Sequence, residues 1–379
     1  MPAASASPFA LPDDIIYLNA AASGPRLHAV NAAAHDAVDQ SARSWAFDIE
    51  AWFDHIEALR ALAADTLGTE PAGLAFVPAA SYGIAVAARN LPLGADRTAV
   101  LLAGEYPSNR NAWMVAAERD GGACIDAAPE AGETWTDAVL RSIDDRTAVV
   151  CVPPVYWTDG APLDLHAIAR AARDRGAALV VDASQSLGAL PFDFDGIAPD
   201  FVASAGHKWL LGALGFGWLW AAPHWRAHGS PIEETWLARE YRESFGTASP
   251  EPLPPYRPGA SRFDAGAFAR PVDVAMATAA MQQLSDWTVP GIRDRLAALT
   301  GHLGERLSAH GMAALMPADH AAHMCTLRPP AERLDAVAAA VADAGIVFSR
   351  RGGGLRIAPH LNVDRAQLDR LVDVLRAAL

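Results

Sequence analysis

The stretch Val180-Val181-Asp182-Ala183-Ser184-Gln185, followed by Ser204-Ala205-Gly206-His207-Lys208, decides the fold of this chain of 379 residues. An apolar, strand-like run ends at Asp182, and a second apolar run, residues 200–203, ends shortly before Lys208. Parallel sheets bind ligands at the carboxyl ends of their strands. We therefore expect both side chains to emerge at the same edge of a parallel sheet.

Each of these two residues also has an ordinary interpretation, because a strand-end aspartate is usually a cap and a lone lysine is usually solvated. Lys208, however, lies among glycine and apolar residues, where desolvation would lower its pKa and make its amine nucleophilic. Pyridoxal phosphate (PLP) catalysis requires an acid that holds a protonated pyridine nitrogen and a lysine that forms an imine. The pair Asp182 and Lys208 therefore predicts a PLP enzyme.

The segment Asp200 to Leu219, with Gly206-His207-Lys208 and Gly215-Phe216-Gly217, resembles the cofactor-attachment signature of class V aminotransferases. That family includes cysteine desulfurases, selenocysteine lyases, kynureninases and isopenicillin N epimerases. The resemblance extends from residues 16–21 to residues 355–360. It implies the α/β fold of type I PLP-dependent transferases, with a mostly parallel seven-stranded sheet in a large domain and a small α+β C-terminal domain. We place an N-terminal arm at 1–15, the large PLP-binding domain at 16–286 and the small domain at 287–379.

Strand-like and helical segments alternate along the chain, which independently indicates βαβ units and a mostly parallel sheet. The strand-like runs are 74–77, 98–102, 147–152, 178–181 and 217–220, with weaker ones at 324–327 and 354–357. The helical patterns cover about 29–64, 82–90, 108–120, 165–176, 272–287 and 290–309.

The composition, 51% hydrophobic and 20% charged, allows a large core, and the length favours two domains. A net charge of −14 argues against nucleic acid and anionic membranes as partners. The three cysteines, Cys124, Cys151 and Cys325, support neither a disulfide framework nor a metal site, and we interpret them as buried thiols. The N-terminus does not resemble a signal peptide and no apolar stretch is long enough to cross a bilayer, so we expect a cytoplasmic protein.

The phosphate and the ring of the cofactor need further contacts. Ala80 and Ser81 open a helix after a strand, and helix N–H groups bind phosphate, although Ser81 has an alternative role as an ordinary N-cap. Tyr106 offers a ring that can stack on the cofactor, with a buried core tyrosine as the alternative. Ala183 is small enough to lie against the opposite face.

The resemblance assigns two further contacts and leaves one open. Gln185 matches the family glutamine that donates to the phenolic oxygen of PLP, and His207 matches a second phosphate donor. Trp157 stands near the place of a family asparagine that also donates to this oxygen. Either the Trp157 N–H replaces that donor, or the contact is lost.

The substrate is expected to carry an α-carboxylate, because a guanidinium grips a carboxylate with two parallel hydrogen bonds. The family uses an arginine at the position of Arg356, for which a surface salt bridge is the alternative. Asn19 and Ala20 resemble the family's substrate-side loop. Residues 262–266 resemble the stretch through which one subunit completes its neighbour's site, which implies a homodimer. An aromatic or apolar substrate body is suggested by five candidate pocket residues: Tyr106, Trp157, Phe268, His360 and Asn362.

The resemblance implies that Lys208 moves the Cα proton of an amino acid, but the reaction that follows stays open between transamination, β-elimination and epimerisation. Residues 348–356 lack the persulfide-forming cysteine of the desulfurases. We therefore favour an aminotransferase or a β-eliminating lyase without a persulfide cysteine. An epimerase and a PLP-fold protein that binds without turnover are the alternatives.

Overall fold

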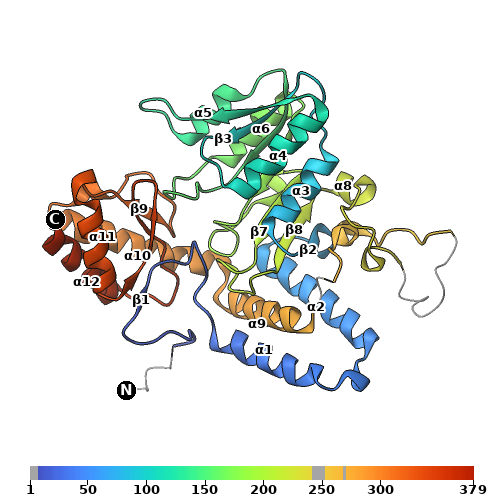
Figure 1. Ribbon diagram of the computed structural model, residues 1–379, viewed down its shortest axis with the longest axis horizontal. Helices are drawn as coiled ribbons and strands as arrows, with labels where there is room; N and C mark the ends of the chain where they lie inside the picture. Colours follow the sequence, from blue (N-terminus) through green and yellow to red (C-terminus); the bar gives the residue numbers. More distant parts are fainter. Residues whose placement is uncertain (1–6, 241–251, 268–269) are drawn as a thin grey trace.

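A seven-stranded sheet lies at the centre of the computed structural model, which describes residues 7–240, 252–267 and 270–379 (Figure 1). Every neighbouring pair of strands is parallel except the two pairs that involve β8. The prediction of a mostly parallel seven-stranded sheet is therefore confirmed. In spatial order the strands are β2 (Leu74–Val77), β8 (Gly217–Ala221), β7 (Phe201–Ala205), β6 (Ala178–Asp182), β5 (Thr147–Val152), β3 (Thr98–Leu102) and β4 (Ala123–Ala127).

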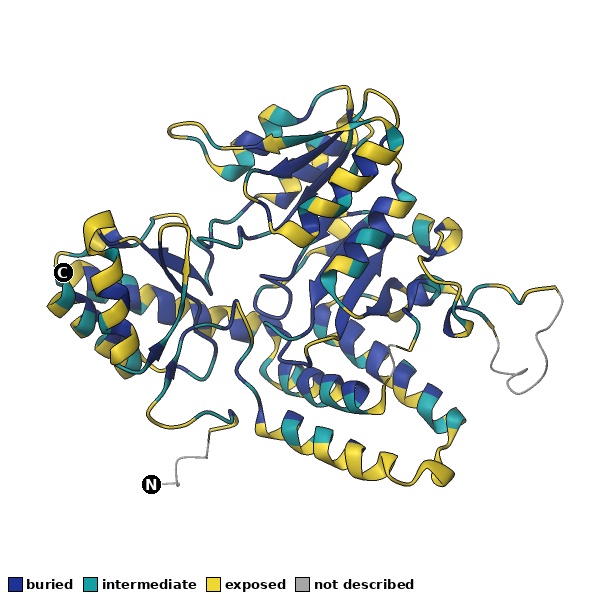
Figure 2. Cartoon of the chain, in the orientation of Figure 1, coloured by how far each residue is buried: buried dark blue, intermediate teal, exposed yellow. Residues whose placement is uncertain are grey.

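Both faces of this sheet are covered by helices, which explains why its strands are continuous apolar runs rather than alternating ones. Val150 and Val181 belong to the core on one face, and their neighbours Val149 and Val180 to the core on the other. Figure 2 shows buried strands between helices whose outer sides are exposed. One face carries α3 (Ala80–Asn90) and α4 (Pro107–Asp120), and the other α2 (Ile49–Leu67), α5 (Trp135–Ser142) and α6 (Leu165–Asp174).

The C-terminal part of the chain forms a small antiparallel sheet with helices against it, gathered at one end of the molecule (Figure 1). Its strands are β9 (Cys325–Leu327), β11 (Ser349–Arg351) and β12 (Gly354–Ile357), and its helices are α10 (Val289–Ala309), α11 (Leu334–Asp343) and α12 (Arg365–Ala378). The N-terminal strand β1 (Ile16–Tyr17) pairs with β10 (Ile346–Val347), so the two ends of the chain meet here. The division into domains at residue 287 stays a prediction.

The sequence pattern located most elements and missed a few. The helix predicted over 29–64 is two helices, α1 (His28–Ser41) and α2, because the Asp48 carboxylate caps a new helix by accepting the N–H groups of Glu50 and Ala51 at 3.0 and 3.2 Å. The segments β4 and α5 were not predicted, and β4 is an edge strand that is only partly buried. The remaining helices are α7 (Phe194–Ile197), α8 (Pro223–His228) and α9 (Pro271–Trp287).

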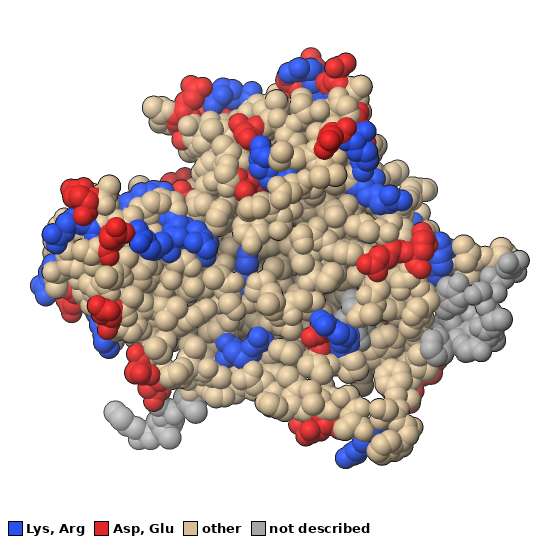
Figure 3. Space-filling view, viewed as in Figure 1, with Lys and Arg blue, Asp and Glu red and all other residues tan. Residues whose placement is uncertain are grey.

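The surface carries mixed charges, and the expectation of buried thiols holds for two of the three cysteines. Figure 3 shows acidic and basic side chains interspersed on one face. None of the described helices is long and apolar enough to cross a bilayer. All three cysteines are free; Cys151 and Cys325 are buried and Cys124 is half-buried.

Candidate active site

A cavity of about 320 Å³ lies at the carboxyl ends of β2, β3, β5, β6 and β7. Loops that follow these strands supply most of its walls, as expected for a parallel sheet. Nine of the predicted site residues line it: Ala80, Ser81, Tyr106, Trp157, Asp182, Gln185, His207, Lys208 and Arg356.

Asp182 and Lys208 reach this cavity from neighbouring strands. Asp182 is the last residue of β6, and its carboxylate accepts a hydrogen bond from the Ser184 N–H at 3.0 Å. Lys208 lies three residues beyond the end of β7. Burial lowers the pKa of Lys208, Asp182 opposes this effect, and Arg356 adds to it. The net shift increases the fraction of unprotonated, nucleophilic amine near neutral pH.

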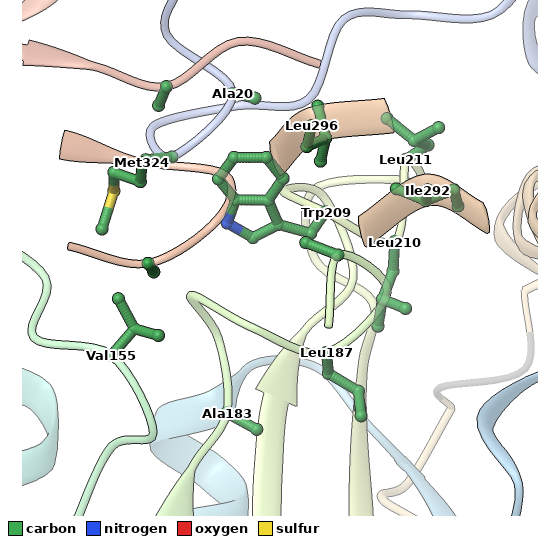
Figure 4. Close-up of a cluster of buried hydrophobic side chains, with 14 of the residues drawn as sticks. Ala20, Val155, Ala183, Leu187, Trp209, Leu210, Leu211, Ile292, Leu296 and Met324 are labelled. Carbon is green, nitrogen blue, oxygen red and sulfur yellow. The ribbon is translucent and has the colours of Figure 1, made fainter. Parts of the chain in front are cut away.

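The loop that carries Lys208 is anchored by its neighbour Trp209, which is fully buried. Figure 4 shows the indole between the sheet side, at Ala183 and Leu187, and the C-terminal helix residue Leu296. The indole N–H donates to the Gln185 side-chain oxygen at 3.1 Å. Packing of Trp209 from both sides thus fixes the backbone position of the lysine.

The first turn of α3 opens onto the cavity through Ala80 and Ser81. The N-cap is Ala79, which has no side-chain cap, so the alternative of Ser81 as an N-cap is wrong. The first N–H groups of a helix have no intrahelical partner and carry the positive end of its dipole. His207 lines the same cavity, and burial, reinforced by the nearby Lys208 and Arg26, lowers its pKa. This end of the cavity can therefore hold an anion such as phosphate.

Two aromatic side chains form one wall of the cavity. Tyr106 is 44% exposed, which contradicts the alternative of a buried core tyrosine, and its ring centroid lies 5.5 Å from the Lys208 amine nitrogen. Its ring meets that of Trp157 edge to face, with centroids 5.5 Å apart. The Trp157 N–H donates to the Gly104 carbonyl at 3.0 Å. Its N–H is thus already used, which favours the alternative in which the asparagine-like contact to the cofactor is lost.

The Gln185 amide is held at both ends. Its nitrogen donates to the Ala21 carbonyl at 3.0 Å, and its oxygen accepts from Trp209. One of its two N–H bonds is left for a ligand in the cavity. Ala183 differs from the expectation, since it is fully buried beside Leu187 and lies outside the lining of the cavity.

Arg356, on β12, is 2% exposed, so the alternative of a surface salt bridge is wrong. Its guanidinium donates to the Trp157 carbonyl at 2.7 Å. Within the described ranges, no protein group accepts from its buried Nε. Burial, together with Arg351, lowers its pKa to about 10. A buried guanidinium with a spare donor at a cavity wall is suited to a carboxylate.

Asn19 and Ala20 are not brought into the lining; Ala21 and Ala22 take their place. The Asn19 side chain accepts from the Ser349 hydroxyl at 2.7 Å, and the Ala20 N–H donates to the Ala358 carbonyl at 2.9 Å. Both residues therefore fasten the N-terminal segment to the C-terminal part of the chain.

Two of the candidates for the substrate body do not line the cavity. His360 is fully buried and packs near Phe9 and Trp287. The Asn362 side chain donates to the Tyr17 carbonyl at 3.1 Å. Phe268 lies outside the described residues. Among the described residues, the aromatic side chains that line the cavity are those of Tyr106 and Trp157.

The stretch 262–266 contributes a buried ion pair within the single chain. The Asp264 carboxylate is fully buried and lies 2.8 Å from the Arg60 guanidinium. It also accepts the Phe76 N–H at 2.8 Å, which ties the stretch to β2. Its predicted role at a subunit interface stays a prediction.

Two charged residues of the lining were missed by the sequence analysis. Glu105 is 5% exposed, and burial raises its pKa to about 8. Its position after the apolar run 98–102 is the same strand-end signal that identified Asp182. Arg351 lies at the end of β11, five residues before Arg356. Its signal in the sequence is the pair of arginines, Arg350 and Arg351, directly before the glycine run 352–354.

Comparison with known proteins places the chain among proteins of similar sequence and fold. The family model "Aminotransferase class-V" matches residues 16–379. A protein of Bacillus subtilis (strain 168) described as the uncharacterized aminotransferase YcbU is 26% identical over 328 residues, which is 83% of this chain and 81% of that protein. Isopenicillin N epimerase of Streptomyces clavuligerus is 30% identical over 174 residues, 45% of this chain and 44% of the epimerase.

Among solved structures, the complex between the cystine C-S lyase C-DES and its reaction product cysteine persulfide superimposes with a TM-score of 0.84. The superposition covers 96% of this chain and 98% of the lyase, at 20% sequence identity. At this identity the likeness establishes a shared fold.

Proposed function

Because the chain belongs to the class-V aminotransferase family, whose members are PLP enzymes, we propose that it removes the Cα proton of an α-amino acid, as an aminotransferase or as a β-eliminating lyase. The observation that carries this proposal is the convergence of Lys208, Asp182 and Arg356 on one cavity. A protein that only bound the cofactor would need no carboxylate-binding arginine beside the lysine.

The residues present fit the cofactor. An amine and a carboxylate come from neighbouring strand ends, and the free N–H groups at the start of α3 lie across the same cavity. In the proposed arrangement Lys208 attaches PLP, Asp182 holds its ring nitrogen, and Ala80, Ser81 and His207 hold its phosphate. Tyr106 lies against the ring, and Gln185 offers its spare N–H to the phenolic oxygen. Trp157 forms part of the cavity wall beside the cofactor. When bound, PLP withdraws electrons from the Cα of an amino acid attached to it.

The chain's own groups would then carry the proton. Arg356 binds the α-carboxylate through its free Nε and thereby orients the Cα–H bond. Lys208, whose pKa is lowered by burial, takes this proton on Nζ and can return it. Asp182, from the neighbouring strand end, would stabilise positive charge on the ring nitrogen.

The cysteines favour release of a leaving group without persulfide transfer. No cysteine is among the described residues that line the cavity. Cys325 is fully buried in β9, and burial raises its pKa to about 12, so it is neither accessible nor ionised. The described part of the cavity therefore contains no cysteine that could carry a persulfide.

The visible absorption spectrum of the purified protein, with Lys208→Ala as control, tests this proposal. We expect a cofactor band that the substitution alters and that an amino acid shifts. Keto acid formed only with an amino-group acceptor would identify an aminotransferase, ammonia would identify a lyase, and an inverted amino acid would identify an epimerase. A protein that stays colourless after PLP is added would overturn the proposal.

The assembly and the location expected from the sequence also remain proposals. A homodimer with shared active sites rests on the resemblance of residues 262–266, and a cytoplasmic location on the N-terminal sequence. Sedimentation of the purified protein tests the first, and fractionation of the source cells tests the second.

A further inference from the structure

The cavity carries more positive charge than one amino-acid carboxylate requires. Beside Lys208, which the proposed function assigns to the cofactor, two guanidinium groups line it, those of Arg351 and Arg356, together with the carboxyl groups of Asp182 and Glu105. Because the pKa of Glu105 is about 8, this carboxyl is mostly neutral at pH 7. The chain as a whole has a net charge of −14, so a local excess of cations is not a consequence of its composition.

One residue, Trp157, positions both guanidinium groups. Its carbonyl accepts from Arg356 at 2.7 Å, and its ring centroid lies 5.8 Å from the central guanidinium carbon of Arg351. The Trp157 indole is itself fixed by its hydrogen bond to Gly104. One guanidinium is thus bonded to the backbone of Trp157, and the other lies near its anchored ring.

Arg351 is also placed by the backbone. It ends β11 opposite Gly354 on β12, and the turn between them consists of Gly352 and Gly353 with φ of 55° and 73°. Two consecutive positive φ values define the tight hairpin turn that matches the twist of the strands, and glycine adopts them without strain. The guanidinium therefore extends from a short, defined hairpin rather than from a long loop.

The neighbouring Arg350 has a different role. Successive residues of a strand point to opposite faces. Arg350 accordingly donates to the Asp335 carboxylate on α11 at 2.7 Å, whereas Arg351 lines the cavity. The hairpin thus presents one arginine to a protein carboxylate and the other to the space where a substrate binds.

We infer that the substrate is an α-amino acid whose side chain carries a second anionic group, and that Arg351 binds this group while Arg356 binds the α-carboxylate. The inference rests on the proposed function, because it assigns the two arginines of the same cavity. Arg351 is exposed at the cavity, and a neutral substrate side chain would leave its guanidinium without an anionic partner there. The expectation of an aromatic or apolar substrate body is replaced by that of an acidic one.

Dissociation constants measured on the PLP-loaded protein test this inference. The ligands are the α-methyl derivatives of glutamate, O-phosphoserine and glutamine, which have no Cα–H to remove, and shifts of the cofactor band report binding. Glutamate and glutamine differ only in side-chain charge, and the phosphoserine derivative distinguishes a carboxylate from a phosphate. We expect at least one acidic ligand to bind about tenfold more tightly than the glutamine derivative.

The variants separate the two arginines. Arg351→Gln should remove this preference and leave the affinity for the glutamine derivative unchanged, whereas Arg356→Gln should weaken all three ligands. Arg350→Gln is the matched control and should retain the preference. The cofactor band and the melting temperature of each variant show that it is folded and loaded.

Three results would overturn the inference: no preference in the wild type, a preference that survives Arg351→Gln, or an equal loss of all three ligands in this variant. The last result would mean that Arg351 binds the α-carboxylate. A wild type with no cofactor band would instead refute the proposed function, and the inference with it.

Discussion

The buried carboxyl of Glu105 makes the stability of the protein depend on pH in a way that can be calculated. Burial raises the pKa of Glu105 from 4.5 to about 8, with Asp182 acting in the same direction and the hydrogen bond from the Tyr106 N–H opposing it. In the unfolded chain the group titrates at its ordinary pKa. Between the two values the folded protein binds more protons than the unfolded chain, so the free energy of unfolding falls as the pH rises.

The magnitude follows from the two pKa values. Each pH unit between them lowers the free energy of unfolding by about 1.4 kcal/mol, which amounts to about 3 kcal/mol at pH 7 and about 5 kcal/mol above the folded pKa. Glu105→Gln removes the ionisation and keeps an oxygen that can accept the Tyr106 N–H. We therefore expect the variant to be more stable than the wild type by about 3 kcal/mol at pH 7, and equally stable at the acidic end of the range.

Urea unfolding of the cofactor-free protein, repeated from about pH 5 to about pH 8.5, measures this effect. The difference between variant and wild type isolates Glu105, because the contribution of other titrating groups such as His207 cancels. Glu118→Gln, an exposed change on α4, is the control and should leave the difference near zero. A difference for Glu105→Gln that does not change with pH would refute the reasoning.

Three other substitutions test the loop that carries Lys208, a buried ion pair and the binding of the carboxylate. A Cβ on Gly24 would lie 2.1 Å from the Lys208 carbonyl oxygen, so Gly24→Ala should lower both the melting temperature and the amount of PLP bound, as read from the absorption spectrum. Asp264→Ala leaves the buried Arg60 without its main counter-charge and should lower the free energy of unfolding by about 3 to 5 kcal/mol in urea titrations. Arg356→Lys keeps the charge and loses the forked geometry, so steady-state kinetics should show about a tenfold rise in KM or more.

The sequence predicted the sheet and the cavity residues at its strand ends because these depend on local patterns. Apolar runs such as 178–181 mark buried parallel strands, and their ends mark the ligand-binding edge. Asp182, Tyr106 and Lys208 all lie at such ends, and all three line the cavity. The break between α1 and α2 was missed because the helical pattern continues across the residues before the Asp48 cap.

The substrate side was harder to predict because it depends on contacts between distant segments. Asn19 and Ala20 were expected in the cavity, but pairing with Ala358 turns Ala21 and Ala22 inward instead. The role of Arg351 depends on a hairpin register and on the place of Trp157, neither of which has a local signal. Sequence patterns identify strand ends, whereas only the packed chain shows which segments meet there.

The loop around Lys208, the lysine proposed to carry the proton, is held by contacts from both ends of the chain. The Gly24 N–H donates to the His207 carbonyl at 2.8 Å, so the N-terminal segment packs on one side of the loop. Trp209 packs edge to face against His323, from the C-terminal part, with ring centroids 4.5 Å apart. Leu211 is held at a φ of 55°, a conformation that costs a non-glycine residue about 1–3 kcal/mol and persists only where the surroundings impose it. A loop held from both ends of the sequence keeps a partly desolvated amine at a fixed place, which is what proton transfer at a single carbon atom requires.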